Sequence, residues 1–186
     1  MQQGFGKFRI WTFSVLALAM PLAACSSEQP AAQPPQPSTE EASGVQVPNP
    51  KDATAIEPCD MLSAQAAAEI GLQPEGKSAH EGAGCRWYSE DRSVSVSLTP
   101  LTDRSIQKYR DSKSAYEDYE EFTIAGHPVI RANQADPAKY GFCDFFLATN
   151  DNQLIHAAGN DSSHADACGP AQKALEAAVP NLPAAN

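Results

Sequence analysis

The chain has 186 residues, of which 23 are acidic and 13 are basic, and its formal net charge is −10 at pH 7. An acidic surface repels phosphate groups, so nucleic acids and anionic lipid headgroups are disfavoured as partners. The length suits one domain with one core, preceded by an N-terminal extension.

The extension begins with the three parts of a secretory signal. Lys7 and Arg9 give a positive start, an apolar run follows over residues 10–19, and the tetrapeptide Leu-Ala-Ala-Cys ends at Cys25. The run is shorter than the roughly 20 apolar residues that a membrane span needs. The tetrapeptide resembles the lipobox of bacterial lipoproteins, which implies cleavage before Cys25 and a diacylglyceryl thioether on its sulfur. An ordinary signal peptide cut near a cysteine is the alternative.

On the lipoprotein interpretation, residues 1–24 are a signal peptide that is removed, and the loss of Lys7 and Arg9 leaves the mature chain near −12. One acyl chain binds a membrane only marginally, whereas two or more anchor a protein stably. We therefore expect a protein held at the cell membrane by lipid on Cys25, on the extracytoplasmic face.

Residues 25–57 are expected to form a disordered tether that starts at the lipidated Cys25. The segment is rich in Gln, Ser, Ala and Glu and almost lacks large apolar residues, so it cannot bury enough surface to offset the entropy of ordering. Its prolines interrupt helices and central strands; they are Pro30, Pro34, Pro35, Pro37, Pro48 and Pro50. A single extracytoplasmic domain is then expected over residues 58–186.

Four cysteines lie in this domain, an even number in an exported chain, which predicts disulfides. Three pairings are possible. We favour Cys59 with Cys85 and Cys143 with Cys168, because each pair closes a similar loop, contributing about 3.5 kcal/mol on the chain-entropy model. The alternative is a metal site, but no Cys-x-x-Cys spacing occurs, and His164 with Cys168 is a weak pair.

The first half of the domain predicts a short helix and two strands. The helix runs over residues 63–70, with Ser63 as its N-cap and Gly71 as its stop. A strand passes through residues 87–88. Alternation of Val and Leu with Ser predicts a half-buried antiparallel strand over residues 94–99, the clearest element in the chain.

The second half predicts two helices and four strands. A mostly polar helix is expected at the surface over residues 103–117, with Thr102 as its cap. The last helix begins near Asp166 and runs to Val179, with Ala171, Ala174, Leu175 and Ala178 facing inward. Strands are expected at residues 122–124, 129–130, 142–148 and 154–158.

Short links between strands favour antiparallel pairing, and helices that cannot cover one another must cover the sheet. The predicted fold class is therefore α+β: an antiparallel sheet of about five to six strands with helices packed on it, braced by two disulfides. Each predicted disulfide would tie the start of a helix to a strand.

Six short pieces of the sequence form a recognisable series, and they are Glu57–Ser63, Gly84–Trp87, Gly126–Pro128, Cys143, Ala167–Cys168 and Leu182–Pro183. In this order they resemble a family of actinobacterial lipoproteins known as domain of unknown function 3558. The resemblance covers most of residues 57–183 and implies four paired cysteines and an α/β fold outside the membrane. It also implies a similarity to the α/β/α sandwich of photosystem accessory and Ran-binding import proteins, and it carries over no catalytic residue.

No catalytic, cofactor-binding or metal-binding residues are predicted. Ser162, Ser163 and His164 stand beside Asp161 and Asp166, but no Gly-x-Ser-x-Gly turn occurs, and a polar loop that caps the last helix is the favoured interpretation. A second histidine, at position 156 within a strand, is expected to be structural or to face outward. The acidic run at residues 117–121 is expected to be a solvated helix end rather than a calcium site.

The function expected from these features is that of a non-catalytic, membrane-anchored binding or accessory module for another envelope protein. A carrier or sensor of a small apolar ligand is the first alternative, and an enzyme acting on the cell envelope is the second. The oligomeric state and the partner stay open.

Overall fold

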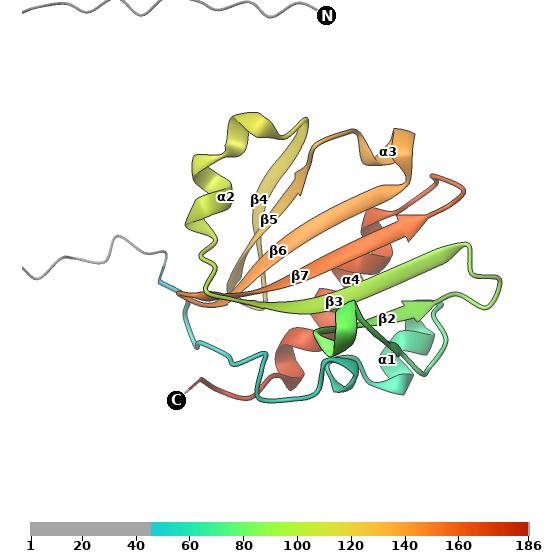
Figure 1. The fold of residues 1–186 in the computed structure, drawn as a ribbon, viewed down its shortest axis with the longest axis horizontal. Coiled ribbons are helices and arrows are strands. Elements are labelled where there is room, and N and C mark those ends of the chain that lie inside the picture. Colours follow the sequence, from blue (N-terminus) through green and yellow to red (C-terminus); the bar gives the residue numbers. More distant parts are fainter. Residues whose placement is uncertain (1–45, 186) are drawn as a thin grey trace, which may run out of the picture. The chain divides into compact units, whose positions relative to one another are not determined.

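The structure, a computed structural model, describes residues 46–185, and within them one antiparallel sheet of seven strands in the order β1-β2-β3-β7-β6-β5-β4 (Figure 1). The strands are β1 (Lys77–Ala79), β2 (Gly84–Tyr88), β3 (Val94–Thr102), β4 (Asp118–Ile124), β5 (His127–Asn133), β6 (Phe142–Asn150) and β7 (Gln153–Asp161).

The helices are α1 (Ala64–Glu69), α2 (Gln107–Asp111), α3 (Pro137–Tyr140) and α4 (Cys168–Ala178). Single 3₁₀ turns lie at Pro58–Asp60, His80–Gly82, Lys113–Ala115 and Val179–Asn181. The α+β class with two disulfides is confirmed, whereas the expected count of five to six strands is too low by at least one.

The strand that the sequence did not predict is β1. Its three residues, Lys-Ser-Ala, have no apolar alternation, and it exists because it pairs with β2, with Lys77 opposite Arg86. Because β1 is held by its pairing with β2 and has only three residues, its sequence shows no alternation from which a strand could be predicted.

The prediction of α1 is confirmed at both ends. The Ser63 side chain accepts a hydrogen bond from the Ala66 amide at 3.2 Å, as an N-cap does. After the helix Gly71 adopts a φ of +88°, which a residue without a Cβ takes at little cost.

The helix expected over residues 103–117 is wrong in length and in its cap. Strand β3 continues through Thr102, which therefore does not cap a helix, and Asp103 turns the chain with a φ of +55°. Helix α2 is only five residues long, yet Ile106 and Tyr109 are buried. The helix lies at the surface, as its mostly polar composition suggested, and its two large apolar side chains dock it on the sheet.

Both faces of the sheet carry a core. On one face Phe145 and Leu147 of β6 pack in a cluster with Trp87 of β2 and Leu175 of α4. On the other face Phe146 and Ala148 belong to a second cluster with Ile106 and Tyr109 of α2. Helices therefore lie on both sides of the sheet, with α1 and α4 on the first face and α2 on the second (Figure 1).

The folded unit includes residues upstream of the boundary expected at residue 58. Val47 joins the second core and Ala53 is fully buried. The Ala53 amide donates to the Gln153 side chain at 2.7 Å, and Lys51 forms a β-bridge with Ala184. The prolines near this segment suggested a disordered tether. Its contacts with the end of the chain could not be predicted, because contacts between distant residues leave no local signal in the sequence.

Among the helices that the structure describes, none is long and apolar enough to cross a membrane. The predicted signal peptide, Cys25 and the first part of the tether lie outside the described residues.

A glycine in β7 sets how closely α4 approaches the sheet. A Cβ at Gly159 would lie well inside van der Waals contact of the Ala167 carbonyl oxygen and against the Ala171 side chain. We expect Gly159→Ala to lower the free energy of unfolding by about 2 kcal/mol or more, because backbone must move to admit the methyl group. Ser95→Thr, which adds a methyl group on the uncovered face of β3, should change it by less than about 0.5 kcal/mol. Urea unfolding of both variants measures the difference, and equal effects would contradict the close approach of α4.

Candidate functional site

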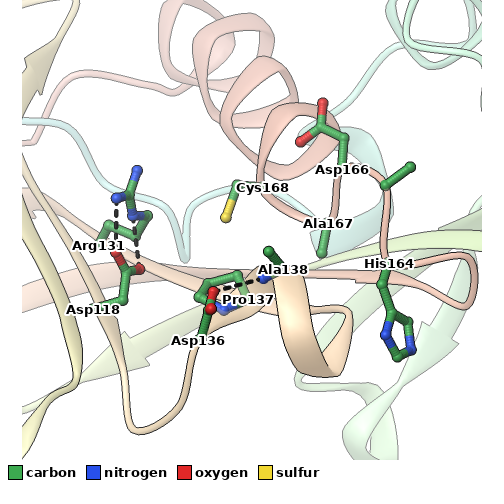
Figure 2. Close-up of a pocket in the computed structure, with 10 residues that line it drawn as sticks. Asp118, Arg131, Asp136, Pro137, Ala138, His164, Asp166, Ala167 and Cys168 are labelled. Atoms are coloured by element: carbon green, nitrogen blue, oxygen red, sulfur yellow. Dashed lines mark hydrogen bonds and ion pairs between the residues drawn. The ribbon is translucent and has the colours of Figure 1, made fainter.

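A cleft of about 240 Å³ lies where the N-terminus of α4 meets α3 and the edge of the sheet (Figure 2). It collects three carboxylates, and two of them cap helices. Asp136 accepts a hydrogen bond from the Ala138 amide at 2.9 Å at the start of α3, and Asp166 accepts one from the Gly169 amide at 2.7 Å at the start of α4. These carboxylates are therefore used in folding.

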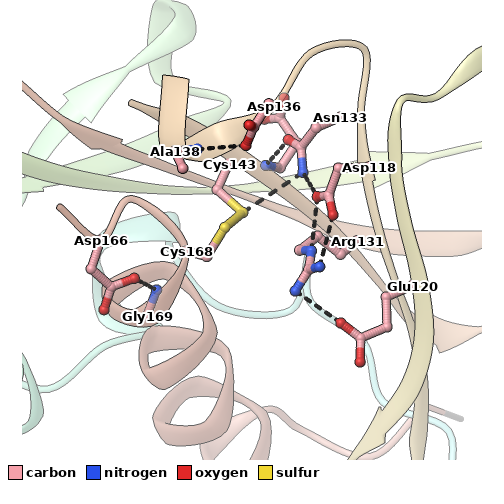
Figure 3. Close-up of a disulfide and its surroundings, with 11 residues drawn as sticks. Asp118, Glu120, Arg131, Asn133, Asp136, Ala138, Cys143, Asp166, Cys168 and Gly169 are labelled. Carbon is pink, nitrogen blue, oxygen red and sulfur yellow. Dashed lines mark hydrogen bonds and ion pairs between the residues drawn. A yellow bond between two sulfur atoms is a disulfide. The ribbon is translucent and has the colours of Figure 1, made fainter. Parts of the chain in front are cut away.

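The third carboxylate, on Asp118, belongs to a network at the edge of the sheet (Figure 3). Arg131 donates to both of its oxygens, at 2.8 and 2.7 Å, and also pairs with Glu120 at 2.8 Å. Asn133 donates to Asp118 at 2.7 Å, accepts from the Asp144 amide at 2.7 Å and lies 3.7 Å from the Cys143 sulfur. The network joins β4 to β5, β6 and a disulfide, so its role is structural.

The surroundings of Asp118 favour its charged form. Burial of the carboxyl works to raise its pKa, but the hydrogen bonds from Arg131 and Asn133 and the Arg131 charge together hold the pKa below its ordinary value. A bidentate guanidinium–carboxylate pair of this kind is stronger than a neutral hydrogen bond. The acid is therefore ionised across the neutral range.

The two disulfides join the pairs that the sequence favoured. Cys59 is bonded to Cys85 and Cys143 to Cys168. The first links the 3₁₀ turn before α1 to β2, and the second links β6 to the first residue of α4. Each disulfide thus fastens a helical segment of the first face to a strand that has a neighbour on both sides.

The loop that holds Ser163 and His164 is organised around Asp161. Its carboxylate accepts hydrogen bonds from the Ser163 hydroxyl at 2.6 Å and from the Asp166 amide at 2.9 Å, which lower the pKa of Asp161. The Ser163 hydroxyl therefore donates to an acid and not to a histidine, and the His164 ring points away from the Asp118–Arg131 pair (Figure 2). These contacts fit a polar loop leading into α4.

His156, the other histidine considered, lies in an aromatic stack on the second face. Its ring stacks on Phe146 at 4.9 Å between centroids, and Phe146 stacks on Tyr109 of α2 at 3.8 Å. Its Nε2 atom lies 2.7 Å from an oxygen of Asp144. This aromatic stack forms the boundary of the part of the second face that α2 covers.

Beyond the stack, the second face of the sheet is open and forms a hollow of about 280 Å³ that we call the trough. Small and polar side chains on β3 and β7 make its floor, and Arg86 of β2 and Phe142 of β6 stand on either side. The floor residues are Ser95, Ser97, Ala158 and Asn160.

The strand registers place these residues in two rows across the sheet, because directly opposed residues of an antiparallel pair point to the same face. The first row is Arg86, Ser97, Ala158 and Asp144, and the second is Tyr88, Ser95, Asn160 and Phe142. Four neighbouring strands at about 4.8 Å spacing separate the two sides of the trough by about 14 Å. Part of this width is filled by the long side chains on either side.

The residues on the two sides of the trough are an exposed aromatic side chain and an arginine that forms no ion pair among the described residues. Phe142 is 60% exposed, and Tyr140, two residues earlier, is 50% exposed. The ion pairs of the described residues use Arg110, Arg131 and His156, so the Arg86 guanidinium takes part in none of them. An exposed aromatic ring across a hollow from an arginine that forms no ion pair among the described residues is unusual for a surface with a purely solvating role.

Sequence reasoning did not single out the trough. The serines of β3 were recognised as its polar face, but Arg86, Phe142 and Asn160 come from three other strands, and only the register brings them together. Among residues 46–185 no group of three or more His, Cys, Asp or Glu side chains is placed to hold a metal ion.

Fold and site together define a small α+β domain, braced by two disulfides, with an open trough on one face of its sheet. The chain belongs to the family described as "Protein of unknown function (DUF3558)", whose model matches residues 20–181. No curated protein and no solved structure was found to match the chain.

The Asp118–Arg131 pair makes a prediction about acid stability. Because the pKa of Asp118 is lowered by folding, its stabilisation is present above the unfolded pKa of about 3.9 and is lost as the pH falls through the native pKa. We expect Asp118→Asn to lower the free energy of unfolding by about 2 kcal/mol at pH 7, with the difference from the unmodified protein shrinking below pH 4.

The matched control is Glu120→Gln, which removes a half-exposed carboxylate that contacts the same arginine at one atom. Its effect should stay below about 1 kcal/mol. Chemical denaturation between pH 2.5 and pH 7 measures both variants. A loss for Asp118→Asn that is independent of pH would show that the carboxylate is not stabilised by its charge.

Proposed function

We propose that the protein is an extracytoplasmic lipoprotein, anchored by acyl chains on Cys25 after removal of residues 1–24, whose domain binds another envelope protein through the trough. It acts as a non-catalytic accessory module. The sequence features that support the anchor are the positive start, the apolar run and the lipobox-like end at Cys25.

The observation that carries the binding role is the uncovered part of the sheet. A domain that has buried Trp87, Phe145 and Tyr109 nevertheless leaves Phe142 with 60% of its surface in water. Aromatic and arginine side chains are enriched at the energetic centres of protein interfaces, where a ring of polar residues excludes water around them. The trough has this composition, with Phe142 and Arg86 beside serine and asparagine.

The position of the trough suits a module attached through its N-terminal end. Gln46, the first described residue, lies beside the β6–β7 turn at Asn150–Asn152. Phe142 and Asn160 stand at the other ends of the same two strands, about 8 residues and therefore about 26 Å away along the strand direction. A partner on the trough is thus kept clear of the attachment point.

The two alternative functions receive less support from the contacts. A carrier of an apolar ligand needs a cavity between sheet and helices, but the layer under α4 is filled by side chains such as Trp87, Phe145 and Leu175, which are fully buried. An enzyme would need a nucleophile paired with a base, and the Ser163 hydroxyl donates to Asp161 instead.

The anchor can be tested by changing one residue. We expect Cys25→Ala to prevent incorporation of radiolabelled palmitate and to move the protein from the membrane fraction to the soluble extracytoplasmic fraction, because the described domain offers no apolar helix to replace the lipid. Cys25→Ser is the more conservative companion variant. Unchanged labelling and membrane retention in both variants would contradict the proposal.

The binding surface can be tested by site-specific photo-crosslinking in intact cells. A benzophenone amino acid at position 142 should cross-link to one defined envelope protein, and the adduct should be reduced at least about tenfold when Ala158→Trp, at a half-buried position, fills the floor of the trough. The same amino acid at Lys173, an exposed position on α4, should give no such adduct. Adducts of equal yield from both positions, or none from position 142, would contradict binding at the trough.

A further inference from the structure

We infer that the trough recognises an acidic segment of the partner protein, with a carboxylate bound by Arg86 and an apolar side chain packed on Phe142. The inference rests on the proposed binding role and specifies the chemistry of the partner at that surface. It is drawn from the charges, the hydrogen-bonding groups and the shape of the trough.

Positive charge gathers on one side of the trough although the chain as a whole carries −10. Arg86 stands on β2 opposite Lys77 of the neighbouring edge strand, so both side chains point to the same face. Arg92 lies over the Tyr88 ring at 4.7 Å in the turn next to these strands, but it adds no net positive charge there because Glu90 and Asp91 precede it in the same turn. None of the three enters an ion pair within the described residues.

The hydrogen-bonding groups beside Arg86 suit a carboxylate. A guanidinium offers parallel N–H donors whose spacing matches the two oxygens of a carboxylate. Ser97, directly across from Arg86 in the same row, is only 3% exposed, so the accessible hydroxyl of β3 is that of the half-buried Ser95, two residues along the strand. The carboxylate already present in this row, on Asp144, is on the far side and is held by His156 at 2.7 Å.

The opposite side of the trough supplies the apolar contact. Phe142 is at the start of β6 and is exposed over most of its surface, while the floor between it and Arg86 is made of small side chains such as Ala158. A hollow of about 280 Å³ accommodates one or two side chains rather than a whole helix. The complementary ligand is therefore a short peptide segment with an acidic residue close to an aromatic or aliphatic one.

The probe for this inference is a pair of nine-residue peptides. One contains three Glu interleaved with two Phe, and its twin carries Gln in place of each Glu. Binding to the full mature chain without lipid is followed by two-dimensional NMR of backbone amides. We expect shifts at Arg86, Ser97 and Phe142, and a dissociation constant at least about tenfold lower for the Glu peptide, a ratio that one charge-assisted contact supplies.

Variants separate a specific contact from general attraction of charge. Arg86→Gln should remove the preference for the Glu peptide, whereas Lys173→Gln, which deletes the same charge from the exposed side of α4, should leave it unchanged. Phe142→Ala should weaken both peptides. Amide spectra of the variants verify the fold, and raising the salt concentration from 50 to 500 mM should weaken the Glu peptide more than its twin.

The other occupants of the trough give different results in the same experiments. Sedimentation as a dimer that Phe142→Ala converts to a monomer would mean that a second copy of the chain fills the trough. Binding to phosphatidylglycerol vesicles that Arg86→Gln abolishes, with no preference between the peptides, would mean that the trough binds a lipid surface. Either outcome overturns the inference, as does equal binding of the two peptides. If the two peptides bind equally but position 142 still cross-links to an envelope protein, only the inference about an acidic segment fails. If that adduct is lost as well, the proposed function fails with it.

Discussion

The second face of the sheet is wider than the one short helix that covers it, and the rest of the structure follows from this mismatch. A sheet of seven strands buries its first face under α1, α4 and the closing segment of the chain. On the second face α2 contributes only Ile106 and Tyr109. Val47 adds to this cover, and Ser97 and Thr99 of β3 are buried, but the other residues of the second face beyond this core face water or another molecule and have to suit that situation on one face only.

The pattern of β3 and β7 meets this requirement residue by residue. Val96 and Leu98 point to the first core, while Ser95 and Ser97 between them point to the trough. A slip of one residue in register would turn the serines toward the first core and move Val96 and Leu98 to the trough face, so the register is specified strongly. The Cys143–Cys168 disulfide and the close contact at Gly159 fix α4 on the first face of the sheet. Because α4 is held there, it does not cover the trough on the second face.

Features that depend on local pattern could be predicted from the sequence, and those that depend on pairing could not. The alternation of β3, the cap at Ser63 and the buried side of α4 were predicted because each leaves a signal within a few residues. The disulfide partners were predicted from the similar size of the two loops that they close. Strand β1 and the short length of α2 were missed because both are decided by distant contacts. The trough was missed for the same reason: each of its rows draws one residue from each of four strands, and no local pattern joins Arg86 to Phe142.

The charge of the whole chain and the charge of the trough act over different distances. At physiological ionic strength the Debye length is about 8 Å, so the overall charge of −10 is largely screened from a partner beyond that range. Within it, the groups that matter are those at the surface of contact, where Arg86 and Lys77 outnumber the single carboxylate held by His156. An acidic partner would thus gain little from long-range attraction and would instead be held after contact. The discrimination that such a surface can offer lies in the rate of dissociation, through the fit of one carboxylate to a guanidinium and of one apolar side chain to an exposed ring.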